Sequence, residues 1–214
     1  MRVCPTPQKC LLGGRDAPTE KPAPVFYLSL DVEATGPFPG LYSLVSIGGL
    51  PVWPPDAEHP EWWVDPSNSY YCEIKPLPEG GILPAAMEVH GLSLEHLENH
   101  GREPAEALED FLAYLTRLRA RIPKFMMAAW PASFDLPFIG YYSQRFLGHN
   151  PFGYNALDIA SLAQGLFRCE RRQLRSKLAR RGLFRPPKPY PHNALDDAQD
   201  QAHLLAGLLN LGSR

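Results

Sequence analysis

The first third of the chain carries the short apolar runs and alternating positions of β-strands. Apolar runs cover 25–30 and 41–47, and residues 69–75 alternate between apolar and polar positions. Patterns of this kind, bounded by Gly and Pro, are typical of strands. No helical pattern separates the three segments, so we predict an antiparallel three-strand meander. Its second connection, over 53–68, contains three tryptophans and is either a self-packed flap or a contact for substrate or a second subunit.

The rest of the chain alternates between strand and helix patterns. In chain order the pattern predicts a helix from Pro104 to Pro123, a strand over 124–130, a helix that Asp135 opens, a strand–helix junction over 154–158, and helices over 174–181 and 194–211. Apolar residues at helical spacing mark the helices, and Pro and Gly mark their ends. Strand–helix units that follow a meander indicate an α/β domain with a mixed sheet and flanking helices.

Length and composition predict one globular domain that follows a tail. The 214 residues are enough for one well-buried domain and few for two. Hydrophobic residues make up 44% of the chain and charged residues 21%, as in folded globular proteins. Five prolines and a Gly-Gly pair fall within the first 24 residues. We therefore predict a flexible proline-rich tail over 1–24 and a single domain over 25–214.

Net charge and cysteine usage limit which cellular compartments and which classes of partner the sequence predicts. The net charge of −2 means that binding to nucleic acid would need a local basic patch. The four cysteines form no Cys-x-x-Cys pair, which argues against a structural zinc site. Cys4 and Cys10 are able to pair, but free thiols in a reducing cytosol are the favoured interpretation. No apolar stretch is long enough to span a bilayer or to form a secretion signal, so we predict a cytoplasmic protein without membrane contact.

Acidic side chains cluster at the predicted carboxyl ends of strands. Asp31 and Glu33 follow the first strand, and at spacing i, i+2 they project from one face. They repel each other there unless a cation lies between them. Ligands gather at the carboxyl ends of strands in open α/β sheets, and Asp135 follows another such strand. The alternative is a strand-end pair of acids at a turn. Oxygen-rich sites suit Mg²⁺ or Mn²⁺ rather than zinc.

Helical phase separates two neighbouring acids in the last helix. Asp197 shares a helix face with Leu204 and Leu208, so it borders the buried side, whereas Asp196 points to solvent. Asn193 is placed to cap this helix, and an acid in the first turn favours the helix dipole. The structural role of Asp196 is therefore explained, and Asp197 is the candidate ligand.

Three motifs in order resemble the DEDDh family of 3′–5′ exonucleases, which includes proofreading subunits of DNA polymerases, ribonuclease T and oligoribonuclease. They are Asp-x-Glu at 31–33, Phe-Asp-x-x-Phe at 134–138 and His-x-Ala-x-x-Asp-Ala at 192–198. The resemblance covers about 25–211 and implies a ribonuclease H-like fold. Pro131 departs from the pattern, because family members usually carry Asn or a similar polar residue there. The polar contact of that residue near the scissile phosphate is therefore in doubt.

The resemblance assigns a role to each candidate catalytic residue. It implies two ions, Mg²⁺ or Mn²⁺, held by four carboxylates. Asp31 would bridge both ions, Glu33 and Asp197 would complete the tighter site, and Asp135 would serve the second. His192 would be the general base that takes a proton from the attacking water, a role suited to a group that titrates near neutral pH.

The resemblance also points to contacts with the 3′-terminal nucleotide. The backbone at Thr35 and Gly36 would approach the terminal sugar. His90 and Gly91 resemble a short His-Gly segment of the family that lies near the terminal nucleoside, although His90 is equally well explained as a turn residue. Phe38 stands between two prolines beside the first carboxylates and is placed to stack on a base.

A basic segment leads into His192. Residues 168–188 contain nine Lys or Arg residues and one acid. A run of charge is usually a solvated face, but this one is also suited to tracking a nucleic-acid backbone. Arg171, Arg172 and Arg175 are the candidate contacts.

The hypothesis favoured by these residues is a two-metal 3′–5′ exonuclease that releases nucleoside 5′-monophosphates from single-stranded 3′ ends. The first alternative is a catalytically silent module on the same fold that binds nucleic acid or protein. The second is a nucleotide phosphohydrolase that uses the same metals. The residues leave the choice between DNA and RNA open. Dimeric relatives make a homodimer an option that nothing in the sequence decides.

Overall fold

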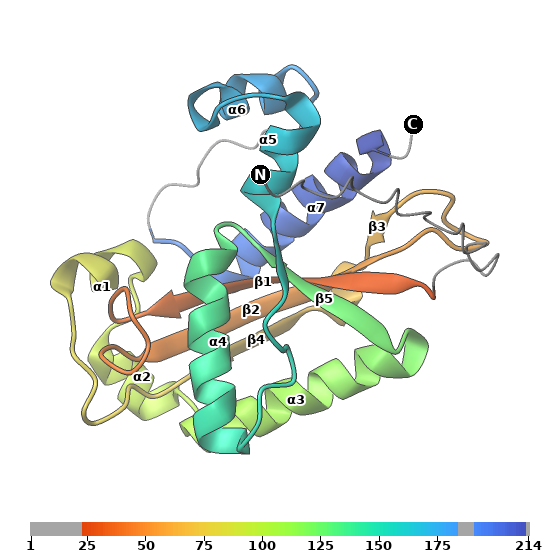
Figure 1. The fold of residues 1–214 in the computed structure, drawn as a ribbon. Coiled ribbons are helices and arrows are strands. Elements are labelled where there is room, and N and C mark those ends of the chain that lie inside the picture. The colour runs from red at the N-terminus through yellow and green to blue at the C-terminus, as the bar shows by residue number, and fades with distance from the viewer. Residues whose placement is uncertain (1–22, 184–190, 213–214) are drawn as a thin grey trace, which may run out of the picture.

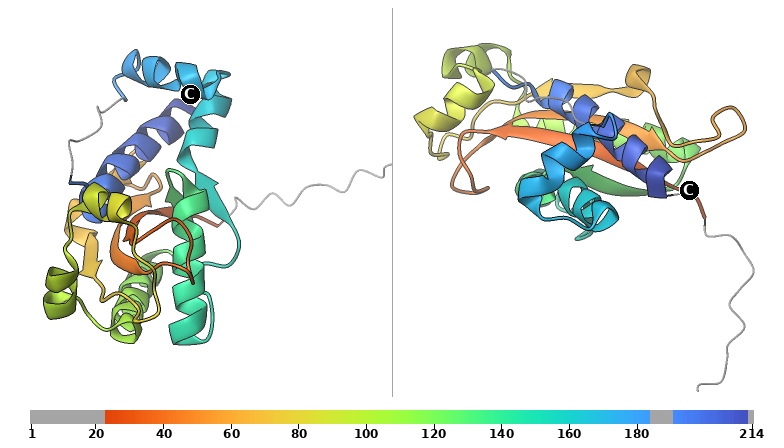
Figure 2. Two further views of the ribbon diagram at one scale, coloured as in Figure 1. Left: turned by 90° about the vertical axis from the view of Figure 1, so that its left-hand side faces the viewer. Right: turned by 90° about the horizontal axis from the view of Figure 1, so that it is seen from above.

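The computed structural model of the chain describes residues 23–183 and 191–212 (Figure 1). The predicted tail over 1–24 falls outside these ranges except for its last two residues, and so do Cys4 and Cys10. Cys72 and Cys169 are free thiols. The described residues form a twisted sheet with helices on both faces (Figures 1 and 2).

The predicted meander and mixed sheet are confirmed. The strands are β1 (Val25–Ala34), β2 (Leu44–Trp53), β3 (Trp63–Val64), β4 (Tyr70–Glu73), β5 (Lys124–Ala129) and β6 (Ala156–Asp158). The sheet order is β3-β2-β1-β5-β6, and β4 also pairs with β2. Pairing is antiparallel from β1 to β2 and from β2 to β3 and β4. It is parallel from β1 to β5 and from β5 to β6.

Helices cover the sheet in two layers. They are α1 (Pro84–His90), α2 (Leu94–His100), α3 (Pro104–Arg121), α4 (Ala132–Leu147), α5 (Ile159–Phe167), α6 (Arg171–Ala179) and α7 (Ala194–Gly212), with a 3₁₀ turn at Pro66–Asn68. One core packs α3 and α4 against the sheet, and the other packs α5 and α7 against the opposite face, with α6 packed on α5. None of the helices within the described ranges is both long and apolar enough to cross a bilayer.

The first strand is longer than its sequence pattern suggested. We expected Asp31 and Glu33 to follow the strand, but β1 continues to Ala34. The reason is the pairing with β2, in which Asp31 lies opposite Gly48 and Glu33 lies opposite Ser46. Backbone hydrogen bonds to a neighbouring strand therefore extend β1 through its polar positions, and the two carboxylates are fixed within the sheet.

Helix α7 lies unusually close to the sheet. A Cβ atom on Gly48 would lie only 2.2 Å from the carbonyl carbon of Ala194, so the absent side chain permits the contact. One turn further along, the hydroxyl of Ser29 donates a hydrogen bond to the carbonyl of Ala198 (2.9 Å). These two contacts fix the beginning of α7 on β1 and β2, and Figure 2 shows α7 lying across the sheet.

The tryptophan-rich connection packs on the body of the protein. The guanidinium of Arg121 lies 4.7 Å from the ring centroid of Trp53 and 5.1 Å from that of Trp63. The side chain of Asn210 accepts from the backbone N–H of Trp62 (2.7 Å) and donates to its carbonyl (3.0 Å). Of the two alternatives for this segment, these contacts favour the self-packed flap.

Candidate active site

Three carboxylates from two distant segments meet near the carboxyl end of the central strand β1. Asp31 and Glu33 come from β1, and Asp197 comes from the first turn of α7. Each offers a carboxylate oxygen, and these oxygens all lie within 4.8 Å of one another. The helical-phase argument selected Asp197, and it is the one in the cluster, whereas Asp196 is exposed.

Asp135 approaches the cluster from α4. It is 2% exposed, and its Oδ1 accepts a hydrogen bond from the backbone N–H of Val32 (3.0 Å). Val32 lies between Asp31 and Glu33, so this bond ties the start of α4 to the acidic stretch of β1. The second oxygen, Oδ2, is buried and has no hydrogen-bond partner among the described residues. Buried carboxylate oxygens are normally satisfied, so a partner such as a cation suits this atom.

The electrostatics of the cluster disfavour four charged carboxylates. Burial raises the pKa of Asp31 well above its usual range, and repulsion from Asp135, Glu33 and Asp197 adds to this. Burial and repulsion from Asp197 and Asp135 raise the pKa of Glu33 to about 8. Burial also raises the pKa of Asp135. A divalent cation removes this repulsion, and the all-oxygen donor set fits Mg²⁺ or Mn²⁺.

Gln201 is a member of the site that the motifs did not identify. Its side-chain N–H donates to Asp31 Oδ1 (2.7 Å), and this bond favours the charged carboxylate. Its own Oε1 is buried and has no hydrogen-bond partner among the described residues. Gln201 follows Asp197 by one helical turn, so it shares the face of α7 that carries this candidate ligand. That spacing was the available signal in the sequence.

His192 lies at the entrance to α7, next to Asp197. The Nδ1 atom of His192 is 3.2 Å from Oδ2 of Asp197. The following residue, Asn193, caps the helix as expected, since its Oδ1 accepts from the N–H groups of Leu195 (3.0 Å) and Asp196 (3.2 Å). The structure therefore brings His192 and all four candidate carboxylates to one region.

Thr35 is fully engaged within the protein. Its N–H donates to the carbonyl of Ser43 (2.8 Å), and its own carbonyl accepts from Leu83 (2.8 Å). Its hydroxyl donates to the carbonyl of Gly81 (2.7 Å) and accepts from the N–H of Ser43 (2.8 Å). Thr35 is also fully buried, and its hydrogen bonds hold the turn after β1.

The other candidate substrate contacts differ in exposure. Gly36 is buried, and a Cβ there would lie 2.3 Å from the ring of Tyr42. Phe38 is 64% exposed, so its ring is available for stacking. His90 is 3% exposed, and its Nδ1 accepts from the N–H of Leu92 (3.1 Å). Gly91 follows it at the surface with a φ of 70°.

The candidate backbone contacts lie on α6, which packs on α5 away from the sheet (Figure 1). Arg171, Arg172 and Arg175 are all exposed. Arg172 forms an ion pair with Glu170 (2.6 Å). Asp158 ends the predicted strand–helix junction and caps α5, because its Oδ1 accepts a hydrogen bond from the N–H of Ser161 (2.7 Å).

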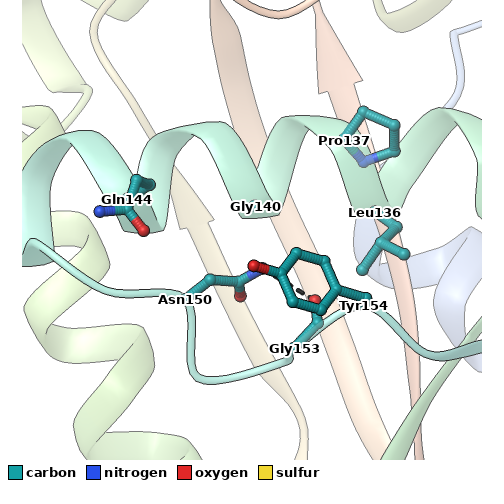
Figure 3. Close-up of a pocket in the computed structure, with 7 residues that line it drawn as sticks. All are labelled: Leu136, Pro137, Gly140, Gln144, Asn150, Gly153 and Tyr154. Carbon is teal, nitrogen blue, oxygen red and sulfur yellow. Dashed lines mark hydrogen bonds between the residues drawn. The ribbon is translucent and has the colours of Figure 1, made fainter.

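A separate pocket lies between α4 and the loop that follows it. Figure 3 shows its lining, which includes Leu136, Pro137 and the ring of Tyr154. None of the candidate catalytic residues lines this pocket. It is therefore distinct from the acidic cluster.

Comparison with known proteins gives a relative in sequence and several similar folds. No family model matches the sequence. The 3′-5′ DNA exonuclease Cap18 of Escherichia coli is 38% identical over 178 residues, which are 83% of this chain and 88% of that protein. A full-length 3′-exonuclease superimposes with a TM-score of 0.67 at 15% identity, over 89% of this chain. The match spans 62% of that longer chain. The nuclease domain of 3′hExo, a DEDDh family member bound to rAMP, gives a TM-score of 0.59 at 13% identity, over 84% of this chain and 88% of that one.

Proposed function

Because the chain belongs to the DEDDh family of 3′–5′ exonucleases and has their ribonuclease H-like fold, we propose that it removes nucleoside 5′-monophosphates from the 3′ end of single-stranded DNA. The observation that supports this most strongly is the cluster of four carboxylates, in which Glu33 and Asp135 are buried and Asp31 and Asp197 are partly buried. The 3′ end of a substrate must reach that cluster near the carboxyl end of β1. An unpaired 3′ terminus does so more readily than a base-paired one.

The four carboxylates are the proposed metal ligands. Asp31 would contact both ions, Glu33 and Asp197 would complete one site, and Asp135 would serve the other. The raised pKa of Glu33 and the unsatisfied Oδ2 of Asp135 both fit a cation partner. Two divalent ions, Mg²⁺ or Mn²⁺, supply the positive charge that activates a water and stabilises the leaving oxygen of a phosphodiester. Gln201 would keep the Asp31 carboxylate in one orientation through its hydrogen bond.

His192 is the proposed general base. Its contact with Asp197 is made through Nδ1. With the proton on Nδ1 donated to that carboxylate, Nε2 carries the lone pair that accepts a proton from water. The orientation of the ring is then set by the same carboxylate that holds a metal. The resulting imidazolium is stabilised by the negative charge beside it.

The choice of DNA rests on the relative that is 38% identical and is named a DNA exonuclease. The test uses matched single-stranded DNA and RNA oligonucleotides, labelled at the 5′ end, with Mn²⁺. We expect a ladder that shortens from the 3′ end, faster on DNA, with mononucleotides as product. The Asp31→Ala variant is the inactive control. Faster degradation of RNA would overturn the assignment of DNA as the substrate. No degradation of either oligonucleotide by the wild type would overturn the exonuclease proposal.

We further propose that residues 25–214 form one exonuclease domain. We also propose a cytoplasmic location, which the free thiols of Cys72 and Cys169 support. A homodimer stays a prediction, and light scattering of the purified protein checks it.

The basic face of α6 is proposed to track the substrate backbone. Arg171 and Arg175 are one helical turn apart, and neither forms an ion pair within the part of the chain that is described. For single strands, log K falls with log salt concentration by about 0.7 per phosphate contact. Replacing both residues by Ala should therefore reduce the magnitude of this slope by about 1.4. Fluorescence anisotropy with a labelled oligonucleotide in Ca²⁺ measures it.

The matched control removes two arginines from the opposite side of the sheet. Arg117 and Arg119 are exposed on α3. Their double Ala variant loses the same charge but should keep the wild-type slope. Equal slopes for the wild type and both double variants would contradict the proposal that α6 binds the substrate backbone.

A further inference from the structure

The end of α1 contacts the loop that carries His192 at two points. The carbonyl of Val89 accepts a hydrogen bond from the backbone N–H of His192 (2.7 Å). Two residues later, Gly91 ends the helix and lies against Pro191. A Cβ atom on Gly91 would lie 2.7 Å from Cβ of Pro191, closer than such atoms approach in proteins. The loop before α7 is therefore seated on α1, and the fit depends on the missing side chain of Gly91.

This contact links the general base to the strand of the carboxylates. The N–H of Leu83, at the start of α1, donates to the carbonyl of Thr35, directly after β1 (2.8 Å). Helix α1 thus joins the end of β1 to the backbone of His192. The imidazole is held on its other side by Asp197, 3.2 Å from Nδ1. Backbone and ring of His192 are fixed by different elements.

We propose that Val89 and Gly91 position His192 for proton transfer. They do this from outside the cluster, through the carbonyl of Val89 and the close packing of Gly91 on Pro191. The proposal rests on the proposed function, because it treats His192 as the base. It differs from a substrate contact at Gly91 in one respect: a positioning role lowers kcat and leaves both KM and metal affinity unchanged.

The chain offers a matched pair of glycines to test this. Gly91 ends α1 with a φ of 70°, and Gly148 ends α4 with a φ of 74°. An Ala at either position has the same backbone strain. A Cβ on Gly148 meets nothing within 4 Å among the described residues, whereas one on Gly91 collides with Pro191. The difference between the two Ala variants therefore isolates the contact with the His192 loop.

The experiment compares Gly91→Ala with Gly148→Ala on a single-stranded DNA oligonucleotide in Mn²⁺. We expect Gly91→Ala to lower kcat about tenfold or more, because small misplacements of a reacting group are costly, with KM within about twofold. Gly148→Ala should behave as the wild type. Pro191→Gly removes the colliding side chain and should restore kcat in the Gly91→Ala background. In a His192→Ala background, Gly91→Ala should have no further effect.

A readout independent of activity is the imidazole NMR signal of His192, assigned by its loss in His192→Ala. It should shift in Gly91→Ala and stay in place in Gly148→Ala. Equal kcat values and unshifted signals in the two glycine variants would overturn the proposal. A raised KM with unchanged kcat would make Gly91 a substrate contact instead. An inactive wild type would overturn the proposed function, and the NMR signal would still decide whether Gly91 positions His192.

Discussion

Asp31→Asn is expected to abolish exonuclease activity and, in the same protein, to raise the melting temperature of the metal-free form. Activity should fall by roughly 10³-fold or more, since a shared metal ligand supplies several kcal/mol of transition-state stabilisation. Stability should rise because desolvation and repulsion from three other carboxylates raise the pKa of Asp31. Asn keeps the shape of the side chain and removes the charge.

The gain in stability should grow with pH. A carboxyl group whose pKa is raised by folding binds more protons in the folded state than in the unfolded state, so stability falls as pH rises between the two values. For Glu33 this window runs from its usual 4.5 to about 8, and Asp31 shifts in the same direction. The wild type without metal should therefore lose stability from pH 5 to pH 8. Asp31→Asn should lose less, because one such group is gone.

Thermal denaturation in EDTA at pH 5, 7 and 8 measures this, with and without added Mg²⁺. Added Mg²⁺ should raise the melting temperature of the wild type at pH 8 and have little effect on Asp31→Asn. The control is Asp196→Asn, one residue from the proposed ligand Asp197 but exposed. It should keep activity and lose about 0.3–1 kcal/mol as a helix-dipole contact. A wild type that is more stable than Asp31→Asn at every pH without metal would contradict the repulsion argument.

Gly48→Ala is expected to have the second large effect, on both folding and catalysis. The new Cβ would lie 2.2 Å from the carbonyl carbon of Ala194 and 2.3 Å from the nitrogen of Leu195. Backbone atoms cannot rotate away as a flexible side chain does, so α7 must move off the sheet and carry Asp197 with it. Overpacking of this kind costs about 1–3 kcal/mol or more, and most metal affinity should be lost.

Urea denaturation and calorimetric titration with Mn²⁺ measure the two effects. Gly49→Ala is the matched control, because the next residue of β2 faces the other way and its Cβ would lie 3.3 Å from the carbonyl oxygen of Ser29. We expect a smaller loss of stability there and wild-type Mn²⁺ affinity. If Gly48→Ala bound Mn²⁺ as the wild type does, the close approach of α7 would not be needed for the site.

The site was predictable where side-chain spacing determines geometry. A strand places Asp31 and Glu33 on one face, and helical phase separates Asp197 from Asp196. These assignments did not require knowing which other segments of the chain lie nearby. The cap formed by Asn193 is local in the same way. The meander and the later strand–helix units followed from periodicity.

Features that depend on contacts between distant segments were not predictable. The extension of β1 to Ala34 is set by its register with β2. Helices α1 and α2 have seven residues each, too few for periodicity to mark them. The bond from His192 to Val89 joins two backbone groups, so no side chain in the sequence signals it. The internal hydrogen bonds of Thr35 reach Ser43, Gly81 and Leu83, so they too depend on segments that are distant in sequence.

The order of the site's segments along the chain has a consequence for synthesis. Asp31 and Glu33 emerge early, Asp135 later, and His192, Asp197 and Gln201 arrive with α7, after every other described element. A nascent chain that lacks α7 would lack the proposed general base and one of the four proposed ligands. On the proposed function, the chain therefore gains activity only after α7 has been translated and has docked on Gly48.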